Sequence, residues 1–202
     1  MFCLMLKYTY NSEIRRLCEM IGWIILIIAI ILILFVVGIY NNLVSLRLRV
    51  KNAWAQIDTQ LKRRFDLIPN LVETVKGYAK HEQDTLEKVI EARNKFTAGG
   101  TVNDVANASA ELSNCLKSIF ALAESYPDLK ANENFNSLQV ELTGTEDKIA
   151  YARQFYNDTV QKYNEAIAIF PNSIIANIFK FNEEQFFQVT KEEEKEPVKV
   201  QF

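Results

Sequence analysis

The chain has 202 residues, of which 49% are hydrophobic and 24% are charged, and its formal net charge is −2. This length favours one domain that is large enough to bury a core without disulfides or metal ions. The near balance of 23 basic and 25 acidic residues excludes the basic surface typical of nucleic-acid-binding proteins. The three cysteines are far apart, so their spacing gives neither a zinc site nor a redox dithiol.

An uncharged segment, MIGWIILIIAIILILFVVGIY, occupies residues 20–40. At about 1.5 Å of rise per residue, about 20 helical residues match the roughly 30 Å hydrocarbon core of a bilayer. Trp23 and Tyr40 stand near its two ends, where amphipathic rings favour the headgroup level. We therefore predict a transmembrane helix, the alternatives being a cleaved signal peptide with Gly38 at the −1 position and a buried core helix.

Basic residues flank this segment equally, three before it and three after it, so the positive-inside rule gives no orientation on this count. Met20 is an alternative start of the chain, in place of an N-terminal tail at residues 1–19. With that start only the C-terminal flank is basic, and we expect the large domain to face the cytoplasm. Residues 41–202 carry a net charge of −3, which argues against strong electrostatic docking onto anionic lipid.

Long amphipathic segments follow the apolar one. In the first, residues 41–68, apolar residues recur at three- and four-residue spacing, as on one face of a helix. Pro69 has no N–H and disfavours helical geometry at the residue before it, so we predict a helix corner there, with Asp66 as the cap of a new helix. That second helix runs to the TAGGT turn at residues 97–101.

The third segment spans residues 103–124 and the fourth spans 131–170, where Gly144 weakens the helix without breaking it. A short apolar helix, SIIANIFKF, follows Pro171, and we predict that the charged tail at residues 183–202 is disordered. The sequence therefore predicts an all-α fold. An N-terminal transmembrane helix precedes an antiparallel four-helix bundle of long helices, residues 41–182, with coiled-coil-like packing.

The sequence contains none of the metal-binding or catalytic motifs that we considered. Bundle di-iron sites use Glu-x-x-His motifs on two helices, but the chain has a single histidine, His81, which follows Tyr78 by three positions. Thr85 stands where a zinc protease would have its second histidine, and no nucleophile elbow or phosphate loop occurs. We predict no metal, no cofactor and no catalytic residue.

Polar residues on or beside the apolar stripes are the candidate site. They are Arg64, Glu82, Arg93, Arg153, Tyr156, Asn157 and Tyr163. Charges that lose their water must pair, so we expect Glu82 to meet Arg64, Arg93 or Arg153. Two interpretations stay open: a polar layer that sets the helix register, or an interhelical cleft that binds a small molecule or peptide.

Three runs in particular resemble the LemA family: AWAQIDTQLKRRFDLIPNLVETVKGYAKHE at 53–82, LTGTEDKIAYARQFYNDTVQKYN at 142–164 and FPNSIIA at 170–176. The resemblance implies one N-terminal membrane helix and a helical bundle, at the bacterial plasma (inner) membrane. Members have no established activity. They are often encoded near membrane metallopeptidases, which implies a partner of that kind, and one relative takes part in building magnetosomes.

These observations together predict a membrane-anchored, non-enzymatic scaffold or interaction protein in bacterial membrane organisation or quality control. Its expected partners are the membrane and a membrane protein, with self-association left open and nucleic acid excluded. The alternative is a binding module for a small molecule or peptide. An enzyme is the third option, and it would need an open cleft that contains His81 or a pair of carboxylates.

Overall fold

The computed structural model describes residues 2–79, 81–97 and 100–188 of the chain. The helices of this part are α1 (Phe2–Tyr78), α2 (Gln83–Thr97), α3 (Val102–Ala123), α4 (Pro127–Lys130), α5 (Glu133–Ala168) and α6 (Asn172–Ile178). No strand occurs among these described residues, so the predicted all-α class is confirmed.

The chain divides into two compact units. The first unit contains Met1–Ser45 and Ala166–Asn182, and the second contains Leu46–Glu165 and Glu183–Phe202. Both α1 and α5 contribute residues to each unit, so the division falls within helices.

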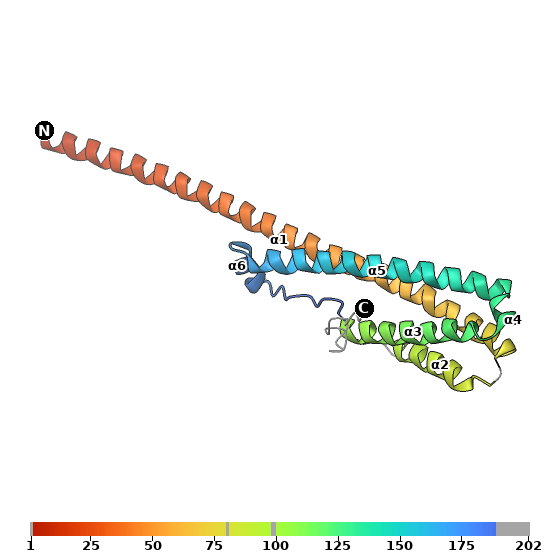
Figure 1. Cartoon of the computed structure of the whole chain (residues 1–202). Coiled ribbons are helices and arrows are strands. Elements are labelled where there is room, and N and C mark those ends of the chain that lie inside the picture. The colour runs from red at the N-terminus through yellow and green to blue at the C-terminus, as the bar shows by residue number, and fades with distance from the viewer. Residues whose placement is uncertain (1, 80, 98–99, 189–202) are drawn as a thin grey trace, which may run out of the picture. The chain divides into compact units, whose positions relative to one another are not determined.

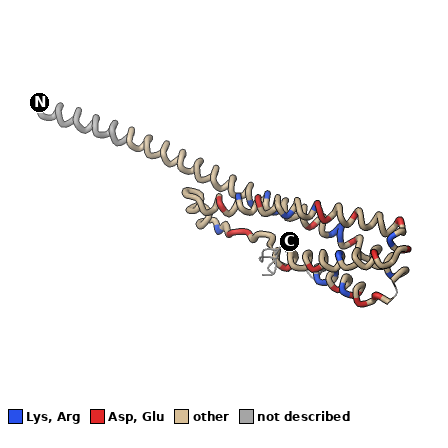
Figure 2. The backbone as a smooth tube through the Cα atoms, in the orientation of Figure 1, with Lys and Arg blue, Asp and Glu red and all other residues tan. Residues whose placement is uncertain are grey.

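In the second unit, α1, α2, α3 and α5 run alternately in opposite directions, and α4 lies in the turn between α3 and α5 (Figure 1). The facing sides of these helices bury the predicted apolar stripes, including Ile57, Leu61, Leu71, Val75, Val89, Leu112, Ile119, Leu142, Ile149 and Val160. Basic and acidic residues are interspersed along the same helices (Figure 2). The antiparallel bundle agrees with the prediction, because each stripe is buried only when it faces the others.

The predicted corner at Pro69 is wrong, because α1 continues through this residue to Tyr78. A proline inside a helix leaves the carbonyl four residues earlier without its N–H donor and costs about 3 kcal/mol. Here that carbonyl belongs to Phe65, and Arg93 Nε on α2 donates to it at 3.3 Å. Pro69 is itself exposed, while Phe65 and Ile68 are buried. A tertiary hydrogen bond and core packing therefore hold the helix together at its weakest point.

The corner lies instead in the connection between Tyr78 and Gln83. Asp66 is exposed within α1, so it is not at a helix start and caps nothing. His81 is exposed in the connection, where the Glu82 amide donates to the Ala79 carbonyl at 3.2 Å. The predicted second helix is therefore divided between the end of α1 and α2.

The remaining helices follow the sequence signals closely. Thr101 and Asp104 form a capping box at the start of α3: the Thr101 hydroxyl accepts from the Asp104 amide at 3.3 Å, and the Asp104 carboxylate accepts from the Thr101 amide at 2.8 Å. Pro127 occupies the first position of α4, where its missing N–H is harmless. As expected, α5 continues through Gly144.

The first unit contains the apolar part of α1. Among the described residues one helix, Met20–Tyr78, is long and apolar enough to cross a membrane, and its most apolar 18-residue window has a mean hydropathy of 3.4. None of that window is buried within the protein. The predicted membrane-spanning segment is therefore supported, and the alternative of a buried core helix is not.

The predicted disordered tail needs a correction at its beginning. Residues 183–188 are non-helical, yet they pack on the bundle, and Phe187 is only 1% exposed. Hydrogen bonds to its backbone and an aromatic anchor replace the helical periodicity that the sequence lacks there. The rest of the predicted tail, residues 189–202, lies outside the described residues.

Candidate functional site

Arg64 is a charge buried in the bundle core, with 2% of its side chain exposed. Its Nη1 lies 2.8 Å from Glu146 Oε2 on α5, and its Nη2 donates to Ser113 Oγ on α3 at 3.0 Å. The Nη1–Oε2 approach is close but not aligned as a hydrogen bond, so this contact is an ion pair. The Ser113 hydroxyl has one proton and lies 3.0 Å from both Glu146 Oε1 and the Ser109 carbonyl.

The two charges of this pair have unequal surroundings. Burial lowers the pKa of Arg64, and the neighbouring Glu146 carboxylate partly raises it again. The Glu146 side chain is 46% exposed, so it stays partly in water although its Oε2 atom facing Arg64 is buried, whereas the guanidinium is almost fully buried. A hollow of about 130 Å³ adjoins the pair, well below the roughly 300 Å³ at which ligand pockets begin. The contact therefore joins three helices and leaves little room for a ligand.

Glu82 does not take the partner that the sequence suggested. Its Oε1 accepts a hydrogen bond from the Tyr126 hydroxyl at 3.2 Å, next to the start of α4. Arg64 pairs with Glu146 instead, and Arg93 donates to the Phe65 carbonyl. The displaced corner is the reason: Glu82 lies in the connection after α1 and not in the middle of a continuous helix.

The other candidates are Arg153, Tyr156, Asn157 and Tyr163 of α5, and they lie along the non-helical segment at residues 183–188. We call the packing of this segment on the bundle the tail contact. Asn157 Oδ1 accepts a hydrogen bond from the Phe187 amide at 2.8 Å, and Asn157 Nδ2 donates one to the Phe187 carbonyl at 3.3 Å. Asn164, two helical turns further on, does the same with both backbone groups of Glu184 at 3.0 Å. The Tyr156 hydroxyl donates to the Gln185 carbonyl at 2.9 Å. Each of these bonds recognises backbone, whatever the side chain.

One side chain provides the anchor of the tail contact. The buried Phe187 ring packs 6.1 Å from the Trp54 ring of α1, and the Arg153 guanidinium lies over it at 4.9 Å. Trp54 in turn packs against Tyr156 at 5.5 Å. A cation over an aromatic face contributes about 0.5–1 kcal/mol at an exposed site and more when water is excluded. Arg153 is therefore engaged with the tail of its own chain.

Two buried phenols border the tail contact. Burial, with a smaller effect from the Glu184 carboxylate, raises the pKa of Tyr156 to about 12. Burial also raises the pKa of Tyr163, with the nearby charges of Arg47 and Glu184 acting in opposite directions. Arg47 Nε and Glu184 Oε1 lie 3.8 Å apart. Both phenols are neutral at ordinary pH, so Tyr156 keeps the proton that it donates to the tail.

The sequence interpretation missed Glu146, Ser113 and Phe187. Glu146 stands four residues after Leu142 and three before Ile149, so its spacing placed it at the edge of the buried stripe of α5. Phe187 belongs to an aromatic pair inside an otherwise polar tail, and this pair was the available signal. Ser113 had none that distinguished it from other serines of α3.

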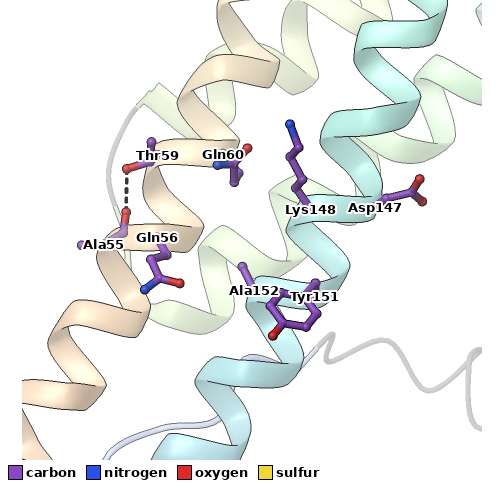
Figure 3. Close-up of a pocket in the computed structure, with 8 residues that line it drawn as sticks. All are labelled: Ala55, Gln56, Thr59, Gln60, Asp147, Lys148, Tyr151 and Ala152. Carbon is purple, nitrogen blue, oxygen red and sulfur yellow. Dashed lines mark hydrogen bonds between the residues drawn. The ribbon is translucent and has the colours of Figure 1, made fainter.

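Two surface grooves are larger than the hollow beside Arg64. One, of about 560 Å³, lies between Ala55–Gln60 of α1 and Asp147–Ala152 of α5. Figure 3 shows Gln60 and Lys148 beside the space between the two helices and Asp147 pointing away from it. The other groove, which we call the end groove, measures about 530 Å³ and is lined by Val72, Glu73, Lys76, Ala79, Gln83, Leu86, Glu87 and Ile90. None of the predicted site residues lines either groove.

Metal-binding side chains do not gather in the described part of the chain: no three of its His, Cys, Asp and Glu residues lie close enough to hold an ion. A comparison with protein families gives a match to the LemA family over residues 53–202. The chain belongs to the LemA family. The predicted resemblance is thus confirmed, and the family match includes α2, α3, α5 and the tail contact.

Curated relatives are distant but extend over most of this LemA-family chain. Protein LemA of Metamycoplasma hominis is 26% identical over 159 residues, which is 77% of this chain and 71% of that protein. Magnetosome protein MamQ 2 of Paramagnetospirillum magneticum is 22% identical over 175 residues, and MamQ of Magnetospirillum gryphiswaldense is 21% identical over 174. The chain spans 64% of the length of each MamQ protein.

Proposed function

We propose that this LemA-family protein is a non-enzymatic scaffold, anchored in the bacterial plasma membrane, that presents its helical bundle to a protein partner on the cytoplasmic side. The state of Arg64 carries the proposal. A binding or catalytic site needs polar groups that are free to meet a ligand. Both terminal nitrogens of Arg64 are occupied, Nη1 by Glu146 and Nη2 by Ser113, and its buried Nε faces no pocket of ligand size, because the hollow beside the pair is small. Its polar atoms fix the packing, which leaves the exposed surface for function.

The end groove is the surface that we assign to the partner. It combines exposed charge at Lys76 with an exposed apolar side chain at Ile90, which is 40% exposed. Partner surfaces commonly place such an apolar contact inside a polar rim. The relatives named as magnetosome proteins support a role in membrane organisation, and by family analogy a membrane metallopeptidase is a candidate partner.

A photo-cross-linking residue at position 76 tests this assignment in intact membranes. We expect a discrete adduct of higher mass from position 76 and none from position 117, since Lys117 is equally an exposed lysine but lies on α3. The charge reversal Lys76→Glu, combined with a cross-linker at the neighbouring exposed His81, should reduce the adduct. Equal adducts from both faces, or none from any exposed face of the bundle, would contradict the scaffold proposal.

The membrane side has its own test. A probe cysteine placed after Glu196 and labelled in intact cells should resist a membrane-impermeant maleimide until the cells are opened. Labelling in intact cells would place the bundle outside the cytoplasm and would change the set of partners.

The tail contact favours a second candidate function, the recognition of a peptide. Asn157 and Asn164 bind backbone atoms at two positions three residues apart, and a buried aromatic ring supplies the anchor. Such contacts suit any segment with an aromatic residue in the Phe187 position. In a Phe187→Ala variant, a fluorescent peptide of residues 181–188 should bind in trans, and an added Asn157→Ala change should abolish binding. If the peptide does not bind the Phe187→Ala variant, this candidate function is refuted.

A further inference from the structure

The first unit exposes a patch of apolar side chains on and around α6. The patch consists of Ile169, Phe170, Ile174, Ile178 and Phe179, which are 58%, 75%, 51%, 64% and 51% exposed. We call it the α6 patch. Single exposed apolar residues are ordinary on protein surfaces, but a contiguous group marks a surface that meets an apolar partner.

The position of α6 identifies this partner. Tyr40, the last residue of the uncharged segment, packs against Phe179 and Phe181 with ring centroids 4.8 and 5.8 Å apart. Figure 1 shows α6 beside α1 in agreement with these contacts. A tyrosine at the end of a membrane span marks the headgroup level. The headgroup layer is about 5–8 Å thick on each side of the hydrocarbon core, so a span that ends at Tyr40 would place Phe179 at the depth of that layer.

Both faces of α6 carry apolar side chains. Ile175 and Ala176 are buried, at 8% and 3% exposed, and form the inner face of the helix. Ile174 and Ile178 are four residues apart, so they share the opposite, exposed face. Asn177 is also exposed on this side, but a short helix that borders only water would not expose two isoleucines beside it. The outer face of α6 is therefore suited to an apolar environment.

We propose that the α6 patch inserts into the interfacial layer of the same bilayer that α1 crosses, so that the chain meets the membrane at a second place. The inference rests on the membrane anchor of the proposed function and adds a second, peripheral contact to it. The bilayer is the occupant that the structure favours over a protein, because α6 is held against the end of the membrane segment itself. The contact is apolar, which agrees with the mildly acidic composition of residues 41–202.

Depth-dependent quenching in lipid nanodiscs tests the proposal on the full chain. Cys3, Cys18 and Cys115 are first replaced by serine. An environment-sensitive fluorophore is then attached to a single cysteine at position 170, 174 or 178. The matched control is Val140→Cys on α5, since Val140 is 72% exposed and Phe170 is 75% exposed. Phosphatidylcholine carrying a nitroxide near its headgroup should quench the α6 probes severalfold more than the control probe, and aqueous iodide should show the reverse order.

Three results would overturn the inference, and they are distinguishable. Iodide quenching at the α6 positions equal to that at position 140, in a chain that resists alkaline extraction, would leave the anchor and refute the second contact. Protection from both quenchers would mean that a second copy or another protein covers the patch. Release of the chain by alkaline extraction would refute the anchor as well. Using three probe positions separately, each checked by its helical circular dichroism, prevents one poorly folded variant from deciding the outcome.

Discussion

Neutralising Glu146 should destabilise the bundle more than removing Arg64, although both changes break the same ion pair. In Glu146→Gln the guanidinium stays in the core with 2% of its side chain exposed and loses its counter-charge. In Arg64→Met the cation disappears, an unbranched apolar side chain fills much of its space, and the Glu146 carboxylate remains partly hydrated. The unequal burial of the two partners therefore predicts unequal losses of stability for the two substitutions, which the distance between the partners does not predict.

The magnitudes follow from that burial. Breaking a buried pair by removing one partner costs about 3–5 kcal/mol, because an uncompensated charge is left inside. The Glu146 side chain is 46% exposed, so water already screens part of the attraction, and we expect about 2–3 kcal/mol for Glu146→Gln. Arg64→Met loses the hydrogen bond to Ser113 as well, and a net loss of about 1 kcal/mol is expected. The double variant should be about as stable as Arg64→Met alone.

Urea unfolding of the full chain in mild detergent, followed by far-ultraviolet circular dichroism, measures these differences. The membrane segment keeps its helicity under these conditions and contributes a constant background. Coupling between the two sites is read from the double-mutant cycle. If Arg64→Met is at least as destabilising as Glu146→Gln, or if the two losses simply add, then the guanidinium does not depend on Glu146 in the way that its burial implies.

Three further predictions concern contacts elsewhere in the second unit. Arg93→Ala should cost about 1–2 kcal/mol in urea unfolding, but at most half of that when Pro69→Ala supplies the missing N–H; equal costs would argue against the compensation. The pKa of Tyr156 is raised from 10 to about 12, so its neutral form stabilises the fold. This contribution is complete below pH 10, is lost towards pH 12, and amounts to at most about 3 kcal/mol. Thermal unfolding of Tyr156→Phe should therefore decline less over that pH range than wild type, and a matching decline would contradict the assignment. Asn157→Ala should speed hydrogen exchange in residues 183–188, whereas the exposed Asn114→Ala should leave it unchanged; a similar effect of both would show that the tail does not depend on the asparagine.

The helices could be predicted from sequence because their signals are local. The spacing of apolar residues predicts which face of a helix is buried, and Leu61, Leu112 and Val160 are indeed fully buried. The corner could not be predicted, because the local rule for proline omits the side chain that arrives from another helix. Arg93 follows Pro69 by 24 positions in the sequence, and nothing in either neighbourhood signals that it reaches the Phe65 carbonyl.

The candidate site was predictable in part for the same reason. Arg64 lies on an apolar stripe, so its burial was correctly expected, but its partner depends on the relative register of α1 and α5. An apolar stripe repeats every few residues and does not specify that register. Glu82 and Glu146 were therefore equivalent as partners until the helices were in place. The tail contact depends on hydrogen bonds to backbone atoms. Every residue has these atoms, so the sequence of the tail does not indicate which of them are bound.

The polar contacts of the second unit are best explained as interactions that stabilise one register of the helices over the alternatives. A bundle held by apolar stripes alone could slip by one turn, about 5.4 Å, with little loss of buried area. Such a slip of α1 against α5 would carry Arg64 Nη1 away from Glu146 Oε2, which now lie 2.8 Å apart, and would leave a cation without a partner. A slip of α1 against α2 would remove Arg93 from the one carbonyl that Pro69 has freed. Each contact destabilises a different misalignment of two helices, and both helices concerned belong to the bundle in each case. Charged residues placed in this way give the core a structural use for its charges, which is compatible with the proposed scaffold.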